Sequence, residues 1–315
     1  MPSKKILVIV GPTASGKTRM AVELAKAHNG EVVSADSMQI YRRMDIGTAK
    51  PTAEEMDGVP HHMIDVADPE EDFSVARYVE MASACVDDIF SRGKLPIVAG
   101  GTGLYVDSLL SGRTFAAFSP DSSLRKELEA ELAERGGEAM LSELSRVDLE
   151  AAARLHPNDH KRIVRALEVY RSTGKTISEH NRETQALPPR YEALTIGLNF
   201  QDRADLWARI DQRVDQMAAA GLEREVRELL SSGLSPRCTA MQAIGYKEFV
   251  AAVEGTMTWR EAEELVKLRS RQYAKRQLTW FRRNPAVHWL LWEKNPNFGN
   301  ARQRSTELLE EFGLG

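Results

Sequence analysis

The chain has 315 residues, of which 42% are hydrophobic and 28% charged, and its formal net charge is −4. This composition is that of a soluble globular protein with a full core, and the negative net charge argues against a protein that binds nucleic acid over its whole surface. Two distant cysteines, Cys85 and Cys238, exclude a disulfide framework, and no apolar run reaches the roughly 20 residues that span a bilayer. We therefore expect a cytoplasmic protein that contacts no membrane.

The first motif lies between a predicted strand, residues 6–10, and a predicted helix, residues 19–26. Its sequence is Gly11-Pro12-Thr13-Ala14-Ser15-Gly16-Lys17-Thr18. This fits the P-loop pattern, in which glycines bring backbone N–H groups against phosphate oxygens and the following helix adds its positive end. Lys17 would contact the terminal phosphate and Thr18 a magnesium ion. The alternative is an ordinary strand, turn and helix, and the motif does not distinguish ATP, GTP and other diphosphates.

Two further loops follow predicted strands. Strand 31–35 ends at Asp36, and strand 95–99 runs into a glycine-rich loop around Thr102. Ligands of an open parallel sheet bind at the carboxyl ends of its strands, so both residues are expected near the P-loop. The alternatives are a turn cap for Asp36 and a tight turn without a ligand for the glycine loop.

His61, His62 and Asp65 are of residue types that bind metal ions. Adjacent histidines on a strand, however, point to opposite faces of the sheet. We therefore favour structural packing over a metal site for this cluster.

Strand and helix patterns alternate in both outer parts of the chain, with helices expected at residues 75–91, 202–220, 222–231 and from Thr258, and strands at 192–198 and 286–292. Residues 121–134 and 157–171 instead show only charged, helical periodicity, with Gly136 and Gly137 separating two helical pieces. We predict an α/β fold: a P-loop NTPase-like parallel sheet flanked by helices, formed by residues 1–118 and 190–315, with an all-helical insertion domain at residues 119–189.

Basic residues are concentrated in two places despite the negative net charge. One is the cluster at residues 160–165, and the other is the stretch from Leu265 to Trp292, which contains no Asp or Glu but holds Lys267, Arg269, Arg271, Lys275, Arg276, Arg282 and Arg283. Such runs are commonly solvated helix faces. The interleaved aromatic residues Tyr273, Trp280 and Phe281 make binding of a polyanion an equal alternative.

The most specific signal is a set of stretches that occur in order along nearly the whole chain. They are the P-loop motif, Asp36-Ser-Met-Gln39, Tyr41-Arg42, Gly47-Thr-Ala-Lys-Pro51, Gly100-Gly-Thr-Gly-Leu-Tyr105, His156-Pro-Asn-Asp159, Ile244-Gly-Tyr-Lys-Glu248 and Tyr273-Ala-Lys-Arg-Gln277. Together they resemble the tRNA dimethylallyltransferase family. The chain lacks the cysteines of the zinc finger that relatives outside bacteria often carry, so it is similar to the bacterial form.

The resemblance implies transfer of a dimethylallyl group from dimethylallyl diphosphate to N6 of the adenosine 3′ to the anticodon (position 37) of tRNA, with Mg²⁺ and release of diphosphate. It implies a monomer with Asp36 as general base and with Lys17, Thr102 and Arg213 as further catalytic residues. The diphosphate contacts implied are Gly11, Pro12, Thr13, Ala14, Ser15, Gly16, Lys17 and Thr18, the last also holding the metal. The tRNA contacts implied are Asp36, Ser37, Met38, Gln39, Thr102, Arg125, His160, Lys161, Arg162, Ile163, Val164, Gln242, Ala243, Ile244, Gly245, Tyr246 and Lys247.

The chemistry of these residue types agrees with the resemblance. An exocyclic adenine amine must lose a proton as it attacks, and a carboxylate such as that of Asp36 can accept it. Two other classes of enzyme remain. One is a small-molecule kinase, which is disfavoured because no apolar strand of the chain ends in a Walker-B aspartate. The other is a prenyltransferase that uses free adenine nucleotide. A non-catalytic RNA-binding protein is more distant, because it would not need a P-loop together with Asp36.

Overall fold

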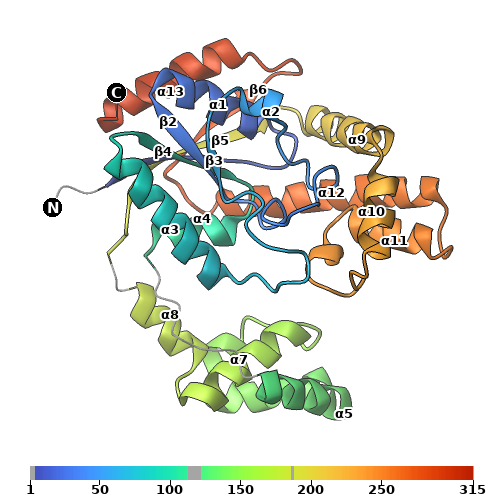
Figure 1. Ribbon diagram of the computed structural model, residues 1–315. Helices are drawn as coiled ribbons and strands as arrows, with labels where there is room; N and C mark the ends of the chain where they lie inside the picture. Colours follow the sequence, from blue (N-terminus) through green and yellow to red (C-terminus); the bar gives the residue numbers. More distant parts are fainter. Residues whose placement is uncertain (1–3, 113–121, 186–187, 315) are drawn as a thin grey trace. The chain divides into compact units, whose positions relative to one another are not determined.

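Residues 4–112, 122–185 and 188–314 are described by the computed structural model (Figure 1). The chain forms two units: the core unit, Met1–Leu110 and Arg190–Gly315, and the insertion unit, Ser111–Pro189. The boundary expected between residues 118 and 119 lies outside the described residues.

The core unit is built on a parallel sheet of six strands in the order β3-β2-β4-β1-β5-β6. The strands are β1 (Lys5–Val10), β2 (Gly30–Ser34), β3 (His61–His62), β4 (Leu95–Gly100), β5 (Glu192–Phe200) and β6 (Val287–Trp292). The first strand lies between β4 and β5, with Val10 opposite both Gly100 and Gly197. The parallel α/β sheet predicted from the sequence is confirmed, and the loops after β1, β2 and β4 leave from one edge of it.

Helices cover both faces of this sheet. Figure 1 shows α1 (Lys17–Ala27) and α13 (Phe298–Phe312) on one face and α3 (Val75–Ser91) and α4 (Gly103–Leu110) on the other. Leu7 and Ile9 of β1 are completely buried in the core on the α1 and α13 side. The remaining core-unit helices are α2 (Ala53–Met56), α9 (Arg203–Ala220), α10 (Leu222–Ser231), η1 (Ala240–Gln242), α11 (Tyr246–Val253) and α12 (Trp259–Phe281).

The described elements of the insertion unit are all helices: α5 (Ser122–Val147), α6 (Leu149–Ala152), α7 (His160–Thr173) and α8 (Ile177–Gln185). The interruption expected at Gly136 is a kink inside α5, where φ is 77°. Leu128, Leu144 and Ile163 form the buried centre of this unit. In the part of the chain that the structure describes, no helix of either unit is long and apolar enough to cross a membrane.

The histidine pair considered as a metal site forms β3 at the sheet edge. His62 Nε2 lies 2.8 Å from a carboxylate oxygen of Glu31, which is only 2% exposed, and His61 Nδ1 lies 2.9 Å from the carbonyl of Val59. Arg92 and Lys94 also pair with Glu31, and hydrogen bonding to the Arg92 guanidinium holds the pKa of this carboxyl well below its usual range. Within the described ranges, no group of three metal-ligating side chains is placed to hold an ion.

Candidate active site

The P-loop leaves β1 at Gly11 and enters α1 at Lys17. A Cβ atom at Gly11 would lie 2.4 Å from the carbonyl oxygen of Leu198, and φ at Gly11 is 150°, so only glycine fits. The N-cap residue of α1, Gly16, has no side chain to cap the helix. The first N–H groups of α1 are therefore left for an anionic ligand, which the helix dipole also favours.

Two aromatic residues from the C-terminal part of the chain support this loop. The indole N–H of Trp292, the last residue of β6, donates to the carbonyl of Ser15 at 2.8 Å and is buried. The ring of Phe298, at the start of α13, lies 4.9 Å from that of Trp292, and the Arg19 guanidinium stacks 4.1 Å from the Phe298 ring. These contacts tie the P-loop and the start of α1 to β6 and α13.

Trp292→Phe should weaken binding of inorganic diphosphate by about three- to tenfold, because it keeps an aromatic ring but loses the hydrogen bond to the Ser15 carbonyl, a bond worth about 1 kcal/mol. Calorimetric titration measures the effect. Trp289→Phe, on the same strand, is the control and should leave the affinity unchanged. Equal affinities for the two variants would contradict a supporting role of Trp292.

Three charged groups predicted to act together are neighbours in the structure. Arg213 of α9 donates to the Thr13 hydroxyl at 3.3 Å and to the carbonyl of Ala49 at 3.5 Å. Lys17 Nζ donates to the carbonyl of Pro12 at 2.7 Å. Burial and then the charge of Arg213 lower the pKa of Lys17 to about 7, whereas Asp36 acts in the opposite direction. Two basic side chains therefore lie close together beside the P-loop, and a bound diphosphate would favour their charged forms.

Asp36 begins the loop that follows β2. Its Oδ1 accepts hydrogen bonds from the N–H groups of Met38 at 2.8 Å and Gln39 at 3.3 Å, which is the turn cap considered from the sequence. This bonding holds one carboxylate oxygen. Asp36 also lies near enough to Arg213 to oppose the lowering of the Arg213 pKa that burial causes.

The glycine loop after β4 is joined to the Asp36 loop. The Thr102 hydroxyl accepts from the N–H of Ser37 at 3.1 Å, and the Thr102 N–H donates to the carbonyl of Ala35 at 3.1 Å. Tyr273 of α12 lies near this loop, and burial, followed by the charge of Asp36, raises the Tyr273 pKa to about 12. The structure thus brings together Asp36 and Thr102, as expected, and adds a neutral phenol.

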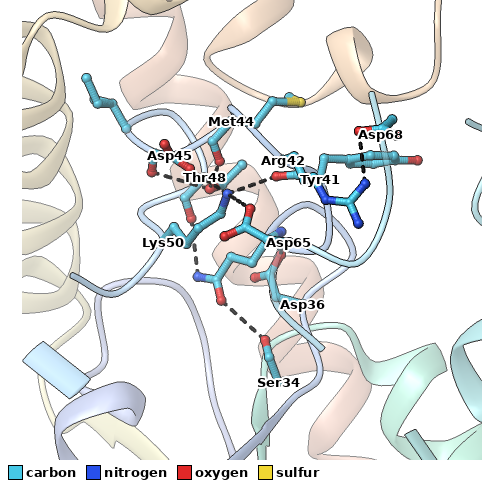
Figure 2. A network of polar contacts seen from close by, with 12 residues as sticks. Ser34, Asp36, Tyr41, Arg42, Met44, Asp45, Thr48, Lys50, Asp65 and Asp68 are labelled. Atoms are coloured by element: carbon cyan, nitrogen blue, oxygen red, sulfur yellow. Dashed lines mark hydrogen bonds and ion pairs between the residues drawn. The ribbon is translucent and has the colours of Figure 1, made fainter. Parts of the chain in front are cut away.

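Polar contacts hold the rest of the Asp36 loop, and Figure 2 shows those of Lys50. Lys50 Nζ, with a side chain only 6% exposed, donates to Asp45 at 2.5 Å, Asp65 at 2.6 Å and the carbonyl of Tyr41 at 2.8 Å. The Gln39 amide accepts from the Ser34 hydroxyl at 3.2 Å and donates to the carbonyl of Ala49 at 3.1 Å. The same carbonyl accepts from Arg213, so the Gln39 and Arg213 side chains share the Ala49 carbonyl as an acceptor.

Several of the tRNA contacts implied by the resemblance need correction. The side chains of Ile163, Val164, Ala243 and Tyr246 are at most 9% exposed. The Tyr246 hydroxyl donates to Glu225 at 2.6 Å, and Glu225 also accepts from three consecutive N–H groups at residues 45–47. Packing inside the protein occupies these side chains, so any contact of these four residues with tRNA would have to come from the backbone.

The exposed members of the implied tRNA segments are His160, Lys161, Arg162, Gln242 and Lys247. Ser37, Met38 and Ile244 are partly exposed, Gly245 is buried, and the Gln39 amide is engaged internally. Arg125 pairs with Glu129 at 3.3 Å and with Glu168 at 3.6 Å, so the insertion unit already neutralises its charge.

Helix α12 is not uniformly cationic once its neighbours are considered. Lys267 pairs with Asp215 at 2.6 Å, and Arg271 pairs with Asp211 at 2.5 Å, both acids belonging to α9. Lys275 and Arg276 are exposed and form no ion pair with any residue in the described ranges. The C-terminal half of the helix therefore presents uncompensated positive charge at Lys275 and Arg276, beyond the two basic residues that α9 neutralises.

The sequence reading did not single out Gln277 as a site residue. Its buried amide accepts from the N–H of Thr13 at 2.9 Å and donates to the carbonyl of Gly101 at 3.0 Å, so that it joins the P-loop to the glycine loop. The only sequence signal for it was its place in the stretch Tyr273-Ala-Lys-Arg-Gln277.

A separate cavity of about 330 Å³ lies between α4, the end of α12 and the start of β6. Val10, Val106 and Trp280 line it, and the Trp280 indole donates to Asp107 at 2.9 Å. None of the four predicted catalytic residues lines this cavity. It is therefore not the place where those groups converge.

The residues at the P-loop are compatible with a magnesium ion. Mg²⁺ commonly binds through one or two protein ligands, with phosphate oxygens and water completing its shell. Thr18 is partly exposed in the first turn of α1, and no hydrogen-bond partner among the described residues occupies its hydroxyl. The Thr18 hydroxyl could therefore be the single protein ligand of a magnesium ion whose other ligands are diphosphate oxygens and water.

Comparison with known proteins agrees with this geometry. The model of the IPP transferase family matches residues 39–284, and that of the isopentenyl transferase family matches residues 4–73. The tRNA dimethylallyltransferases of Acetivibrio thermocellus and Geobacter sulfurreducens are each 50% identical to the chain, over 285 and 293 residues, with 90% and 92% of this chain and 91% and 93% of those proteins covered.

Solved structures give the same result. The full-length tRNA isopentenylpyrophosphate transferase of Bacillus halodurans is 44% identical, with a TM-score of 0.73, and the match covers 98% of this chain and 97% of that one. A eukaryotic dimethylallyltransferase, described as acting on tRNA, is 31% identical with a TM-score of 0.84, covering 98% and 79%. The chain therefore belongs to the tRNA dimethylallyltransferase family.

Proposed function

We propose that the enzyme transfers a dimethylallyl group from dimethylallyl diphosphate to N6 of the adenosine at position 37 of tRNA and releases diphosphate. The observation that carries this proposal is the position of Asp36. The carboxylate influences the charged states of both Lys17 and Arg213, and its loop is bonded to Thr102. These contacts support a site in which a proton acceptor lies beside the groups that would hold the diphosphate.

In the proposed reaction, the N6 amine of adenosine attacks C1 of the dimethylallyl group, the bond from C1 to the diphosphate oxygen breaks, and Asp36 accepts the proton that N6 loses. Lys17, Arg213 and the N–H groups at the start of α1 stabilise the charge that collects on the departing diphosphate. A bound Mg²⁺, held by Thr18 and diphosphate oxygens, would add positive charge at the same place. Thr102 would position the adenosine beside Asp36.

The topology disfavours a kinase. In P-loop kinases and ATPases a Walker-B aspartate helps to hold the Mg²⁺ of the nucleotide. Here β4, a strand beside β1, ends in Gly100, and Gly101 follows it. We propose that ATP is at most a weak competitor for the P-loop, and that no phosphoryl group is transferred.

The acceptor is proposed to be tRNA rather than a free nucleotide, because the C-terminal half of α12 presents uncompensated positive charge close to the glycine loop. A base of a tRNA loop must be splayed from its stack to reach such a site, and binding energy from the rest of the tRNA can position it. Such an acceptor is present in the cytoplasm, where we propose that the enzyme acts as a monomer.

To test the function, the enzyme is incubated with unmodified tRNA and dimethylallyl diphosphate, and the nucleosides of the tRNA are then analysed by mass spectrometry. We expect dimethylallyl adenosine and free diphosphate to form in equal amounts, and AMP to be a poor acceptor. Phosphoryl transfer from ATP that depends on tRNA would instead favour a kinase. Prenylation of AMP as efficient as that of tRNA would favour an adenylate prenyltransferase.

The double variant Lys275→Ala and Arg276→Ala should weaken tRNA binding and reduce the salt slope, d log K/d log[salt], by about 1 to 2, because fewer phosphates are neutralised. Binding measured between low and moderate salt gives the slope. The control, Lys294→Ala with Arg302→Ala, removes equal charge from exposed sites beyond β6 and should leave the slope unchanged. An unaltered slope in the first variant would mean that this half of α12 is a solvated face.

A further inference from the structure

Helix α12 places one buried amide between the two loops that are proposed to hold the donor and the acceptor. Gln277 is 5% exposed, its Oε1 accepts from the Thr13 N–H at 2.9 Å, and its Nε2 donates to the Gly101 carbonyl at 3.0 Å. Each half of the amide is matched to its partner, since a flipped amide would set donor against donor and acceptor against acceptor. The amide orientation is therefore fixed by both loops together.

This amide connects the P-loop and the glycine loop beyond the point where the hydrogen bonds of the sheet end. The ladder between β1 and β4 ends at Val10 and Gly100, before either loop begins. Beyond this point Gln277 joins the loops through a residue 264 positions from Thr13 and 176 from Gly101. The spacing between the P-loop and the glycine loop thus depends on where α12 holds one side chain.

The glycine loop is shaped to receive α12 at close range. A Cβ atom at Gly101 would lie 2.1 Å from Gln277 Nε2, and one at Gly103 would lie 2.2 Å from the Trp280 ring. Gln277 and Trp280, one helical turn apart on α12, therefore pack closely against the glycine loop. The Gln277 amide also bonds to the P-loop at Thr13.

We propose that Gln277 is a positioning residue that sets the separation between the bound diphosphate and the bound adenosine, an inference that rests on the proposed function. The donor contacts the P-loop and the acceptor contacts Thr102, so each ligand can still bind when the link is lost. What changes is the alignment of N6 with C1, and a misplacement of about 1 Å can lower a rate by about 10². Loss of Gln277 should therefore affect turnover far more than binding.

Two variants and a matched control test this. Gln277→Leu removes both hydrogen bonds, whereas Gln277→Glu keeps an acceptor for Thr13 but sets a carboxylate oxygen against the Gly101 carbonyl. Gln272→Leu makes the same replacement at an exposed position of the same helix. The measurements are the single-turnover rate of prenyl transfer with both substrates saturating, the Kd values of inorganic diphosphate and of tRNA, and the melting temperature.

We expect Gln277→Leu to lower the single-turnover rate by about 10- to 100-fold with both Kd values within about threefold of wild type. Gln277→Glu should lower the rate by less, and Gln272→Leu should match wild type. A rate for Gln277→Leu equal to that of Gln272→Leu would overturn the proposal. So would loss of both binding affinities and of melting temperature in the two Gln277 variants, which marks a general structural role. Wild-type protein that prenylates no tRNA would instead contradict the proposed function itself.

Discussion

Asp36→Asn is expected to lower the single-turnover rate of prenyl transfer by about 10² to 10⁴, the usual contribution of a general base, while tRNA affinity stays within a few-fold of wild type. Asparagine retains Oδ1, which accepts from Met38 and Gln39, so the turn should persist. What it loses is the capacity to take a proton from N6. Rapid-quench kinetics with saturating substrates measures the chemical step.

The control for this variant is Asp45→Asn, which removes a negative charge from the same loop, where Asp45 pairs with Lys50 (Figure 2). Asp36, unlike Asp45, is among the charges that act on Lys17. We expect its rate to stay within a few-fold of wild type. A near-normal rate for Asp36→Asn would exclude Asp36 as the base. Equal losses in both variants would indicate that the loop, and not the proton acceptor, had been damaged.

The elements that the sequence predicted well are those specified by local patterns. The unit of β1, P-loop and α1 follows from an apolar run, a glycine-rich turn and an amphipathic helix in immediate succession. The predicted helix at residues 75–91 coincides with α3, because Ser74 caps it by accepting from Arg77 and Gly93 follows it. Capping residues and apolar periodicity act within a few residues, so the sequence displays them directly.

The elements not foreseen depend on partners far along the chain. Strand β3 consists of two residues and exists only because β2 lies beside it. Helix α13 was not predicted after the last strand, although Asn297 caps it and Leu308 and Leu309 pack into the core on the α1 side. Its stability comes from that packing, and packing is not visible in a local window.

The residues of the candidate site likewise fall into those that the sequence could bring together and those that it could not. Lys17, Asp36 and Thr102 could be brought together from the sequence because loops after parallel strands leave from one sheet edge. Trp292 and Gln277 could not, because their contacts with Ser15 and Thr13 join positions more than 260 residues apart. Nothing local distinguishes a tryptophan that ends a strand from one that supports a phosphate loop.

The family resemblance assigned tRNA contacts to whole segments of the chain. It did not show which side chains of a segment face outward. In α7, Ile163, Val164 and Leu167 face the centre of the insertion unit, while Lys161 and Arg162 face outward. Helical periodicity alone would have separated these two groups. In the same way, the stretch from Leu265 to Trp292 contains no acid, but Asp211 and Asp215 of α9 pair with Arg271 and Lys267 of α12.

The pH dependence of diphosphate binding should report Lys17 directly. In the free, metal-free protein the pKa of Lys17 is lowered from 10.5 to about 7 by burial and by Arg213. A bound diphosphate favours the ammonium form, so above pH 7 binding takes up a proton. The Kd of inorganic diphosphate in the presence of a metal chelator should therefore rise as pH increases from 7 to 9, by up to about tenfold per unit.

Lys17→Arg provides the comparison, because a guanidinium keeps its charge throughout this range. Diphosphate itself also titrates, but in the same way with both proteins, so the difference between the two curves belongs to residue 17. We expect the variant to give a flatter curve, with its affinity at pH 9 closer to its affinity at pH 7. Parallel curves would mean that Lys17 is already protonated at pH 9 before diphosphate binds. Isothermal titration in buffers of different ionisation enthalpy adds an independent measure: above pH 7 it should detect proton uptake of up to one per diphosphate in the wild type, and less in the variant.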